Sequence, residues 1–91
     1  MTKVFWTGDA MANRNAAIER IARDNIEAAL DQLAEVMRQT ERLARFHHLG
    51  RPGRKKGTRE LSINRTRFVI TYRIIGENIQ VMYFRHTSQK G

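Results

Sequence analysis

The sequence predicts an α+β domain in which an N-terminal strand and a two-helix hairpin pack on an antiparallel sheet, in the order β-α-α-β-β-β. Two observations carry this prediction. The first half of the chain contains a long alanine-rich segment with apolar residues at helical spacing, and the second half contains three β-branched and aromatic runs separated by short turns. A chain of 91 residues has room for one hydrophobic core, so we expect a single domain at residues 1–91.

The N-terminal half begins with a short aromatic and β-branched run that predicts a strand at Lys3–Thr7. Two helices are expected next, at residues 9–23 and 25–46. They are separated because Asp24 is placed to accept hydrogen bonds from the first free amides of the second helix, and Glu27 follows three residues later as in a capping box.

The second helix has the broader apolar face of the two. Its periodic residues include Ile26, Leu30, Leu33 and Met37. A face of this width needs a large apolar partner, which the narrow stripe of the first helix does not provide. We therefore expect the second helix to dock on the sheet through Leu30, Leu33 and Met37.

The C-terminal half begins with a glycine- and proline-rich loop at His47–Gly57, for which no regular structure is expected. Strands are predicted at Arg59–Ile63, Arg67–Ile75 and Asn78–Arg85. The last two strands are joined by Gly76-Glu77, and a two-residue loop with glycine first fits a type II′ turn.

This turn fixes a register in which residue i lies opposite residue 153 − i. The face expected to cover the helices then carries Phe68, Ile70, Tyr72, Ile74, Ile79, Val81 and Tyr83. The other face carries Arg67, Val69, Thr71, Arg73, Gln80, Met82, Phe84 and His86. A slip of one residue in the turn would exchange the second strand's residues between the faces.

Positive charge is segregated along the chain. Residues 1–50 carry seven basic and seven acidic side chains, whereas residues 51–91 carry ten Lys and Arg against Glu60 and Glu77. Such a cationic module is suited to bind phosphates or an acidic protein, although charge that serves only solubility is the alternative. The candidate residues for binding a target or nucleic acid are Arg51, Arg54, Lys55, Lys56, Arg59, Arg67, Arg73 and Arg85.

Several other site classes are not supported. The chain has no cysteine, His47 and His48 are adjacent, and the remaining histidine is His86, so we expect no metal site and no cofactor. The segment GRPGRKKG does not join a strand to a helix as a phosphate-binding loop does. No apolar run is long enough to span a membrane or to form a signal peptide, so a cytoplasmic location is expected.

One catalytic mechanism is compatible with these residues. Metal-independent cleavage of RNA needs a base for the ribose 2′-hydroxyl, cations for the phosphorane-like transition state and an acid for the leaving oxygen. His86 could act as acid or base, and Arg67 and Arg73 could supply the cations. The alternative for His86 is an ordinary histidine at the end of a strand.

Taken together, this order of elements resembles the RelE/ParE superfamily of toxins from bacterial type II toxin–antitoxin modules. The resemblance covers nearly the whole chain. Its most specific parts are Leu49-Gly50-Arg51-Pro52-Gly53-Arg54, Gly57-Thr58-Arg59-Glu60-Leu61, Val69-Ile70-Thr71-Tyr72-Arg73-Ile74 and Arg85-His86-Thr87 with Gln89. The resemblance implies a cognate antitoxin, a heteromeric toxin–antitoxin complex and the RelE/ParE-like fold.

The resemblance also implies two candidate targets. RelE-like members cleave messenger RNA on the ribosome and place a catalytic arginine three positions before the tyrosine of the third strand, where this sequence has Val69. The Gly-Arg-Pro-Gly-Arg and Gly-Thr-Arg-Glu-Leu segments and the late His86 are more similar to the ParE branch, whose members are chiefly DNA gyrase inhibitors. ParE relatives commonly have an aromatic–proline pair after the glutamine, whereas this chain has Gln89-Lys90-Gly91.

A ParE-like gyrase inhibitor is thus the leading interpretation. The alternative is a ribosome-dependent endoribonuclease that uses Arg67, Arg73, His86 and the loop lysines. A plain nucleic-acid-binding module is a third interpretation, which rests on the basic charge alone.

Overall fold

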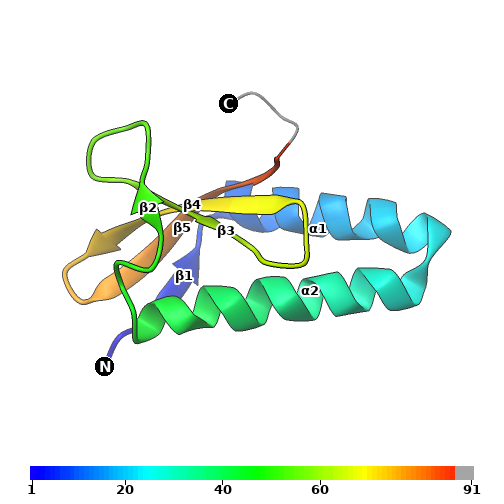
Figure 1. Ribbon diagram of the computed structural model, residues 1–91, viewed down its shortest axis with the longest axis horizontal. Coiled ribbons are helices and arrows are strands. Elements are labelled where there is room, and N and C mark those ends of the chain that lie inside the picture. Colours follow the sequence, from blue (N-terminus) through cyan, green and yellow to red (C-terminus); the bar gives the residue numbers. More distant parts are fainter. Residues whose placement is uncertain (88–91) are drawn as a thin grey trace.

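The protein, described by a computed structural model over residues 1–87, combines a five-stranded sheet with a helical hairpin (Figure 1). In chain order the elements are β1 (Val4–Trp6), α1 (Gly8–Asp24), α2 (Ile26–Glu41), the 3₁₀ turn η1 (Arg42–Ala44), β2 (Arg51–Pro52), β3 (Arg59–Ser62), β4 (Phe68–Ile75) and β5 (Asn78–His86). The strands lie in the order β1-β5-β4-β3-β2. The predicted β-α-α-β-β-β arrangement is confirmed.

The two edges of the sheet differ from the expectation of a wholly antiparallel sheet preceded by an irregular loop. β1 pairs with β5 in parallel, so the sheet is mixed. At the other edge β2 forms inside the predicted loop and pairs antiparallel with β3, with Arg51 opposite Glu60. Pro52 is compatible with this position because an edge strand has one side without a ladder partner for the missing N–H.

The helix junction has a different cap from the predicted one. α1 continues through Asp24, and Asn25 caps α2 by accepting a hydrogen bond from the backbone N–H of Ala28 at 3.0 Å. Asp24 was therefore wrongly predicted as the cap. Both residue types are good caps, and the backbone conformation at Asn25, which is extended, decides between them.

The hairpin contacts the sheet most closely through α1, which packs on β5, while the C-terminal part of α2 and the following η1 turn contribute one side chain each to the buried core. Val36 and Leu43 are fully buried in the core with Ile70, Tyr72 and Val81 of the sheet.

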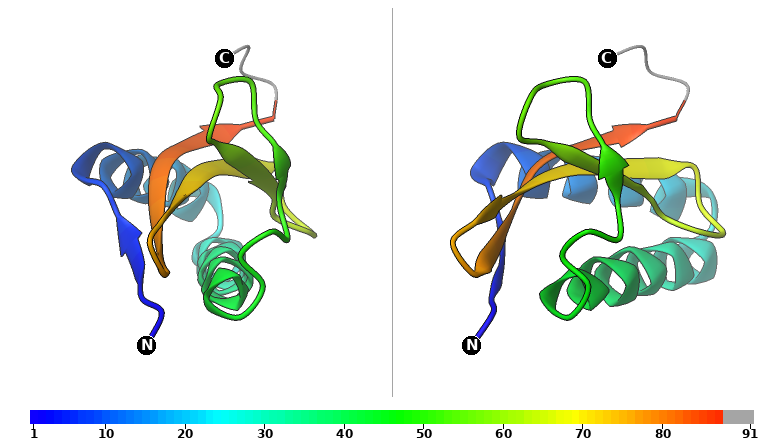
Figure 2. Two further views of the ribbon diagram at one scale, coloured as in Figure 1. Left: turned by 90° about the vertical axis from the view of Figure 1, so that its left-hand side faces the viewer. Right: turned by 60° about the vertical axis from the view of Figure 1, so that its left-hand side comes forward.

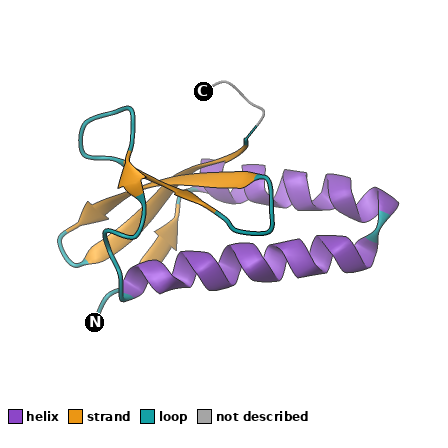
Figure 3. Ribbon diagram, viewed as in Figure 1, coloured by secondary structure: helices purple, strands orange, loops and turns teal. Residues whose placement is uncertain are grey.

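The large apolar residues in the N-terminal half of α2 are more exposed, because both helices continue past the end of the sheet (Figure 3). Leu30 is 60% exposed and Ile26 is 67% exposed, while Leu33 and Met37 are only partly buried. The predicted docking through Leu30, Leu33 and Met37 is thus wrong for Leu30. The sequence periodicity identified an apolar stripe but not the length over which the sheet covers it.

The β4–β5 hairpin has the predicted two-residue turn, and its register is as predicted only near that turn. Ile75 pairs with Asn78, and Gly76 has the positive φ of 61° that a type II′ turn requires at its first position. The predicted pairs continue as far as Tyr72 with Val81. Beyond this point Thr71 pairs with Tyr83, so Met82 is an extra residue in β5, a β-bulge.

The bulge exchanges the faces of the residues that follow it. Phe84 is buried against Phe68, with ring centroids 4.8 Å apart, whereas Tyr83 is 42% exposed on the other side of the sheet. His86 contacts the Phe68 ring edge-on at 5.9 Å. The predicted places of Tyr83, Phe84 and His86 were therefore wrong, because the extra residue reverses the alternation of side chains along the strand.

Thr7 attaches the bulge to the start of α1. Its hydroxyl donates to the carbonyl oxygen of Met82 at 3.1 Å and accepts from the backbone N–H of Ala10 at 3.1 Å. Its own backbone N–H donates to the carbonyl oxygen of Val81 at 3.0 Å. One side chain thus caps a helix and satisfies a carbonyl at the irregular part of the ladder.

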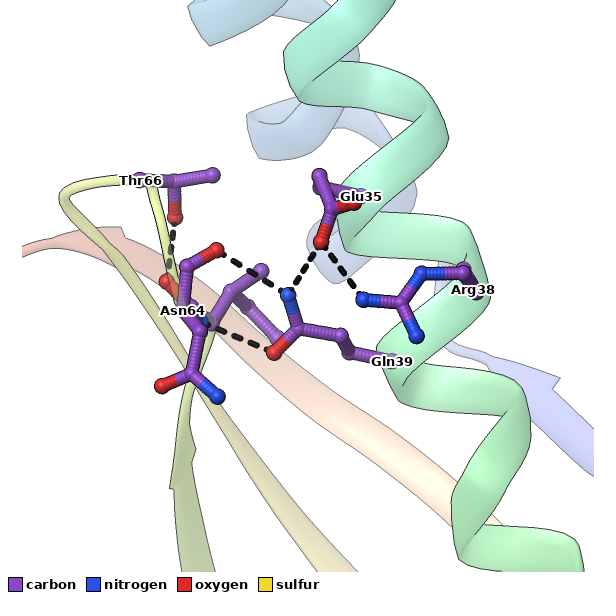
Figure 4. A network of polar contacts seen from close by, with 6 residues as sticks. Glu35, Arg38, Gln39, Asn64 and Thr66 are labelled. Atoms are coloured by element: carbon purple, nitrogen blue, oxygen red, sulfur yellow. Dashed lines mark hydrogen bonds and ion pairs between the residues drawn. The ribbon is translucent and has the colours of Figure 1, made fainter.

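Gln39 attaches α2 to the turn between β3 and β4 (Figure 4). Its buried side-chain amide accepts from the backbone N–H of Asn64 at 2.8 Å and donates to the Asn64 carbonyl oxygen at 3.0 Å. The same nitrogen also donates to Glu35 at 2.6 Å, and Glu35 in turn accepts from Arg38 at 2.8 Å. These donors stabilise the ionised carboxylate, and the hydrogen bonds from Arg38 and then Gln39 lower the pKa of Glu35 below its usual value.

We predict that Leu43→Ala lowers the free energy of unfolding by about 2–5 kcal/mol, since it leaves a cavity under the sheet. Leu30→Ala removes the same atoms from an exposed site and should cost less than about 1 kcal/mol. Chemical denaturation of both variants measures the difference. Equal losses would contradict the observed burial of Leu43 and exposure of Leu30.

We predict that Thr7→Val, which is nearly isosteric, lowers stability by roughly 1–3 kcal/mol because the Met82 carbonyl and the Ala10 amide both lose a partner. Thr7→Ser keeps the hydroxyl and should retain most of that stability. Thermal unfolding of the two variants provides the comparison, and a Thr7→Ser loss as large as that of Thr7→Val would show that the hydroxyl is not the stabilising group.

The lowered pKa of Glu35 predicts a specific pH dependence. A carboxyl group whose pKa is depressed in the folded state contributes stability above its unfolded pKa, and this contribution disappears as the pH falls through the folded value. Glu35→Gln should therefore have a lower thermal midpoint than the parent at about pH 6, and the gap should narrow as the pH falls through the folded-state pKa of Glu35. A gap that stays constant over this range would assign the effect to geometry and not to charge.

Candidate target-binding surface

The side of the sheet turned away from α2 carries exposed aromatic and cationic side chains. We call this surface the open sheet face, and its exposed members are Phe5, Arg51, Lys55, Arg73, Ile75 and Tyr83. Register places them together, since Phe5 and Arg73 both lie opposite Gln80, and Thr71 lies opposite Tyr83. Residues directly opposite in adjacent strands share a face.

The centre of the open sheet face consists of buried, uncharged side chains. Val69 is only 4% exposed and Thr71 is also buried. Val69 lies between Ser62 of β3 and Arg85 of β5 in the ladder. At this position the resemblance to RelE-like nucleases would require an arginine, and the strand instead supplies a buried branched alkyl group.

A partly buried carboxylate organises one end of this face. Glu60 lies 3.6 Å from the guanidinium of Arg51 and 3.6 Å from that of Arg85, and its side chain is 13% exposed. Arg51 is largely exposed at the edge strand, whereas Arg85 is more deeply placed. Both arginines were predicted as binding residues, and the structure brings them to the same carboxylate.

The loop between β2 and β3 rises from the sheet on the side away from α2 and presents Arg54, Lys55 and Lys56 (Figure 2). Thr58 closes it, because its carbonyl oxygen accepts from Gly53 at 2.8 Å and its hydroxyl donates to the Lys55 carbonyl at 2.6 Å. The Lys55 ammonium lies 5.9 Å from the centre of the Tyr83 ring. The basic loop is thus joined to the exposed aromatic of β5 by a cation–π contact.

Arg59, another predicted binding residue, forms hydrogen bonds that hold the preceding loop in place. Its guanidinium donates to the carbonyl oxygen of Gly50 at 2.9 Å. The same segment is held from the core by Tyr72, whose hydroxyl accepts from the Gly50 amide at 2.9 Å and donates to the His47 carbonyl at 2.8 Å. A Cβ at Gly50 would lie 2.6 Å from the Glu60 carbonyl oxygen, so only glycine permits this close approach.

Arg67 and His86 lie elsewhere, at the end of the β4–β5 ladder opposite the turn that joins these two strands. They line a cleft of about 850 Å³ together with Arg20 and Arg65, two residues that sequence reasoning did not select. Arg20 is one of several charges on a helix and Arg65 is one residue of a turn, so neither gave a signal in the sequence. Arg85 also lines this cleft, which we call the basic cleft.

The three residues proposed for RNA cleavage do not converge. Arg67 and His86 share the basic cleft, but Arg73 is not part of its lining and its guanidinium donates to Gln80 at 2.8 Å. Six positions along an extended strand correspond to roughly 20 Å between Arg67 and Arg73. Within residues 1–87, no three His, Asp or Glu side chains gather as they would around a metal ion.

No helix within the described part of the chain is long and apolar enough to cross a membrane. Gln89, one of the residues that carry the family resemblance, lies outside the residues that the structure describes.

Comparison with known proteins gives a consistent result at the level of family and fold. A family described as the ParE toxin of the type II toxin–antitoxin system parDE matches residues 4–91. A protein of Sinorhizobium fredii (strain NBRC 101917 / NGR234) named "Putative toxin Y4kP" is 30% identical over 88 residues, which are 97% of this chain and 91% of that protein. A solved chain titled as the chromosomal ParDE system from P. aeruginosa superposes with a TM-score of 0.83 at 26% identity, covering 94% of this chain and 96% of that one.

Proposed function

The chain belongs to the ParE toxin family of type II toxin–antitoxin systems, and from this premise we propose that it arrests bacterial growth by binding DNA gyrase. We further propose that a cognate antitoxin neutralises it in a heteromeric complex, and that both events take place in the cytoplasm. The open sheet face is the surface that we assign to the target.

The composition of the open sheet face supports a protein target. Phe5 is 50% exposed and Tyr83 is 42% exposed, and Arg73 lies in the same part of the sheet. Tyrosine and arginine are over-represented among residues that dominate protein–protein binding energy, because each combines a large contact area with directed hydrogen bonding. The basic loop beside Tyr83 adds attraction for an acidic partner surface.

One observation favours this binding role over the alternative, a ribosome-dependent messenger RNA interferase. The buried Val69 stands where the nuclease resemblance requires a cation. Loss of one cation at a scissile phosphate removes several kcal/mol of transition-state stabilisation in comparable sites. The separation of Arg73 from Arg67 and His86 also favours the binding role over RNA cleavage.

The surface chemistry also defines what an antitoxin would need. The cationic half of the molecule favours an acidic segment, and the exposed Ile26 and Leu30 on the projecting part of α2 favour apolar side chains. A segment that is acidic and amphipathic could satisfy both surfaces, and such segments are commonly disordered before they bind.

We predict that Arg73→Ala weakens inhibition of supercoiling by purified gyrase by roughly 1–3 kcal/mol, or about 5- to 150-fold, because a charge-assisted contact is lost. Arg23→Ala removes an equal charge from the exposed last turn of α1 and should have little effect. Supercoiling titrations of both variants, matched for folding by circular dichroism, measure this difference.

The same proteins should be induced in cells while the 5′ ends of messenger RNA are mapped. The proposal requires growth arrest without codon-specific cuts. Defined cuts in the ribosomal A site that disappear in His86→Ala, together with unaffected supercoiling, would replace gyrase inhibition with the ribonuclease alternative.

A further inference from the structure

The basic cleft is lined by residues of α1, α2, the β3–β4 turn and the end of β5. Figure 1 shows the helical hairpin extending past one end of the sheet. The basic residues of the cleft are Arg20 of α1, Arg65 and Arg67 of the β3–β4 turn, and Arg85 and His86 at the end of β5. The Arg85 guanidinium also lies 3.6 Å from Glu60. Among residues 1–87, no carboxylate lines the cleft. The rest of the wall combines apolar residues, Ala16, Ala17, Ile21 and the nearly buried Phe68 and Phe84, with the polar residues Asn13, Gln32 and Thr66.

The turn that carries Arg65 and Arg67 is held in place by hydrogen bonds from two directions. Gln39 binds both backbone polar groups of Asn64, as Figure 4 shows. Thr66 fixes the other side, since its hydroxyl donates to the Ile63 carbonyl at 2.8 Å and accepts from the Phe68 amide at 3.1 Å. The arginines at the cleft are therefore presented by a fixed backbone.

Arg65 itself has an unusual conformation. Its φ of 68° lies in the left-handed region, which glycine or asparagine would adopt at lower cost. Strain of this kind persists where the surrounding structure imposes it, and it occurs preferentially at binding sites. The two hydrogen bonds from Gln39 to the Asn64 backbone hold the turn in this conformation. They thus place a guanidinium at a position where the backbone alone would favour glycine or asparagine.

The chemistry of the cleft fits a phosphate better than a carboxylate. Guanidinium groups bind phosphate oxygens in pairs, and several of them around one cavity match the many acceptors and high charge density of a phosphate chain. A single carboxylate would bind only one of these guanidinium groups through paired hydrogen bonds. The volume is within the range of pockets that hold small molecules, and the apolar part of the wall could accept a base and sugar.

We propose that the basic cleft binds the phosphates of a nucleotide, with the apolar part of its wall against the base. The nucleotide is either free or part of a single strand. The cleft shares Arg85 with the end of the open sheet face, but Phe5, Arg73 and Tyr83, the residues assigned to gyrase binding, are not among its lining residues. Failure of the gyrase proposal would leave the cleft proposal intact, and the reverse also holds.

The test uses the isolated full chain with three probes, ATP, inorganic pyrophosphate and a single-stranded hexanucleotide, in calorimetric titrations at about 150 mM salt to limit nonspecific attraction. The parent protein should bind at least one nucleotide probe. Arg20→Gln and Arg67→Gln should each weaken that binding about tenfold, as expected for loss of a charge-assisted contact. Arg23→Gln, on the exposed end of α1, is the matched control and should change it less than about twofold.

Arg65→Gly separates binding from folding. Glycine suits the positive φ, so this variant should keep or raise the thermal midpoint while it weakens nucleotide binding about tenfold. ATP binding with little affinity for the hexanucleotide would identify a free nucleotide as the ligand, and tighter binding of the hexanucleotide would identify a strand.

Two results would overturn the proposal. The first is equal affinity of the parent, the cleft variants and Arg23→Gln, which would reduce all binding to the net charge of the protein. The second is displacement of ATP by hexaglutamate at concentrations below the ATP dissociation constant, which would assign the cleft to an acidic protein segment.

Discussion

The β-bulge at Met82, held by the hydroxyl of Thr7, determines which side chains of β5 reach the core and which reach the surface. Without the extra residue, Tyr83 would continue the buried row and Phe84 would be exposed. With it, Phe84 packs on Phe68 and Tyr83 lies beside the basic loop. Both candidate binding surfaces therefore depend on one irregular position in the ladder.

The Thr7 contact also explains why the helices and the sheet keep a fixed relation at this position. The hydroxyl has one donor proton and available lone pairs, and it uses them on the Met82 carbonyl and the Ala10 amide. α1 thus begins at a point defined by β5. Because α2 is joined to α1 through the short Asn25 junction, the direction of the whole hairpin follows from that start, including the part that extends past the sheet.

Buried and partly buried side-chain polar groups hold the loops of this small protein in place. Tyr72 and Arg59 hold the segment around Gly50, and Gln39 holds the turn at Asn64. A buried polar group costs free energy unless its partners are present, so each contact penalises alternative loop conformations. As a result, a fixed backbone presents arginine side chains on two surfaces, the open sheet face and the basic cleft. This matters in a chain that has few residues available for a core.

The sequence by itself determined the order of elements, the glycine turn at Gly76, the family resemblance and the cationic character of the second half, because these follow from local periodicity, turn chemistry and composition. It did not determine the register beyond Val81, since a bulge depends on a contact with Thr7, which is distant in the chain. It identified the apolar stripe of α2 but not the exposure of Leu30, which depends on where the sheet ends. Only the tertiary structure brought Arg20 and Arg65 together and kept Arg73 away from His86, because a shared cleft is a property of packed segments and carries no pattern within any one of them.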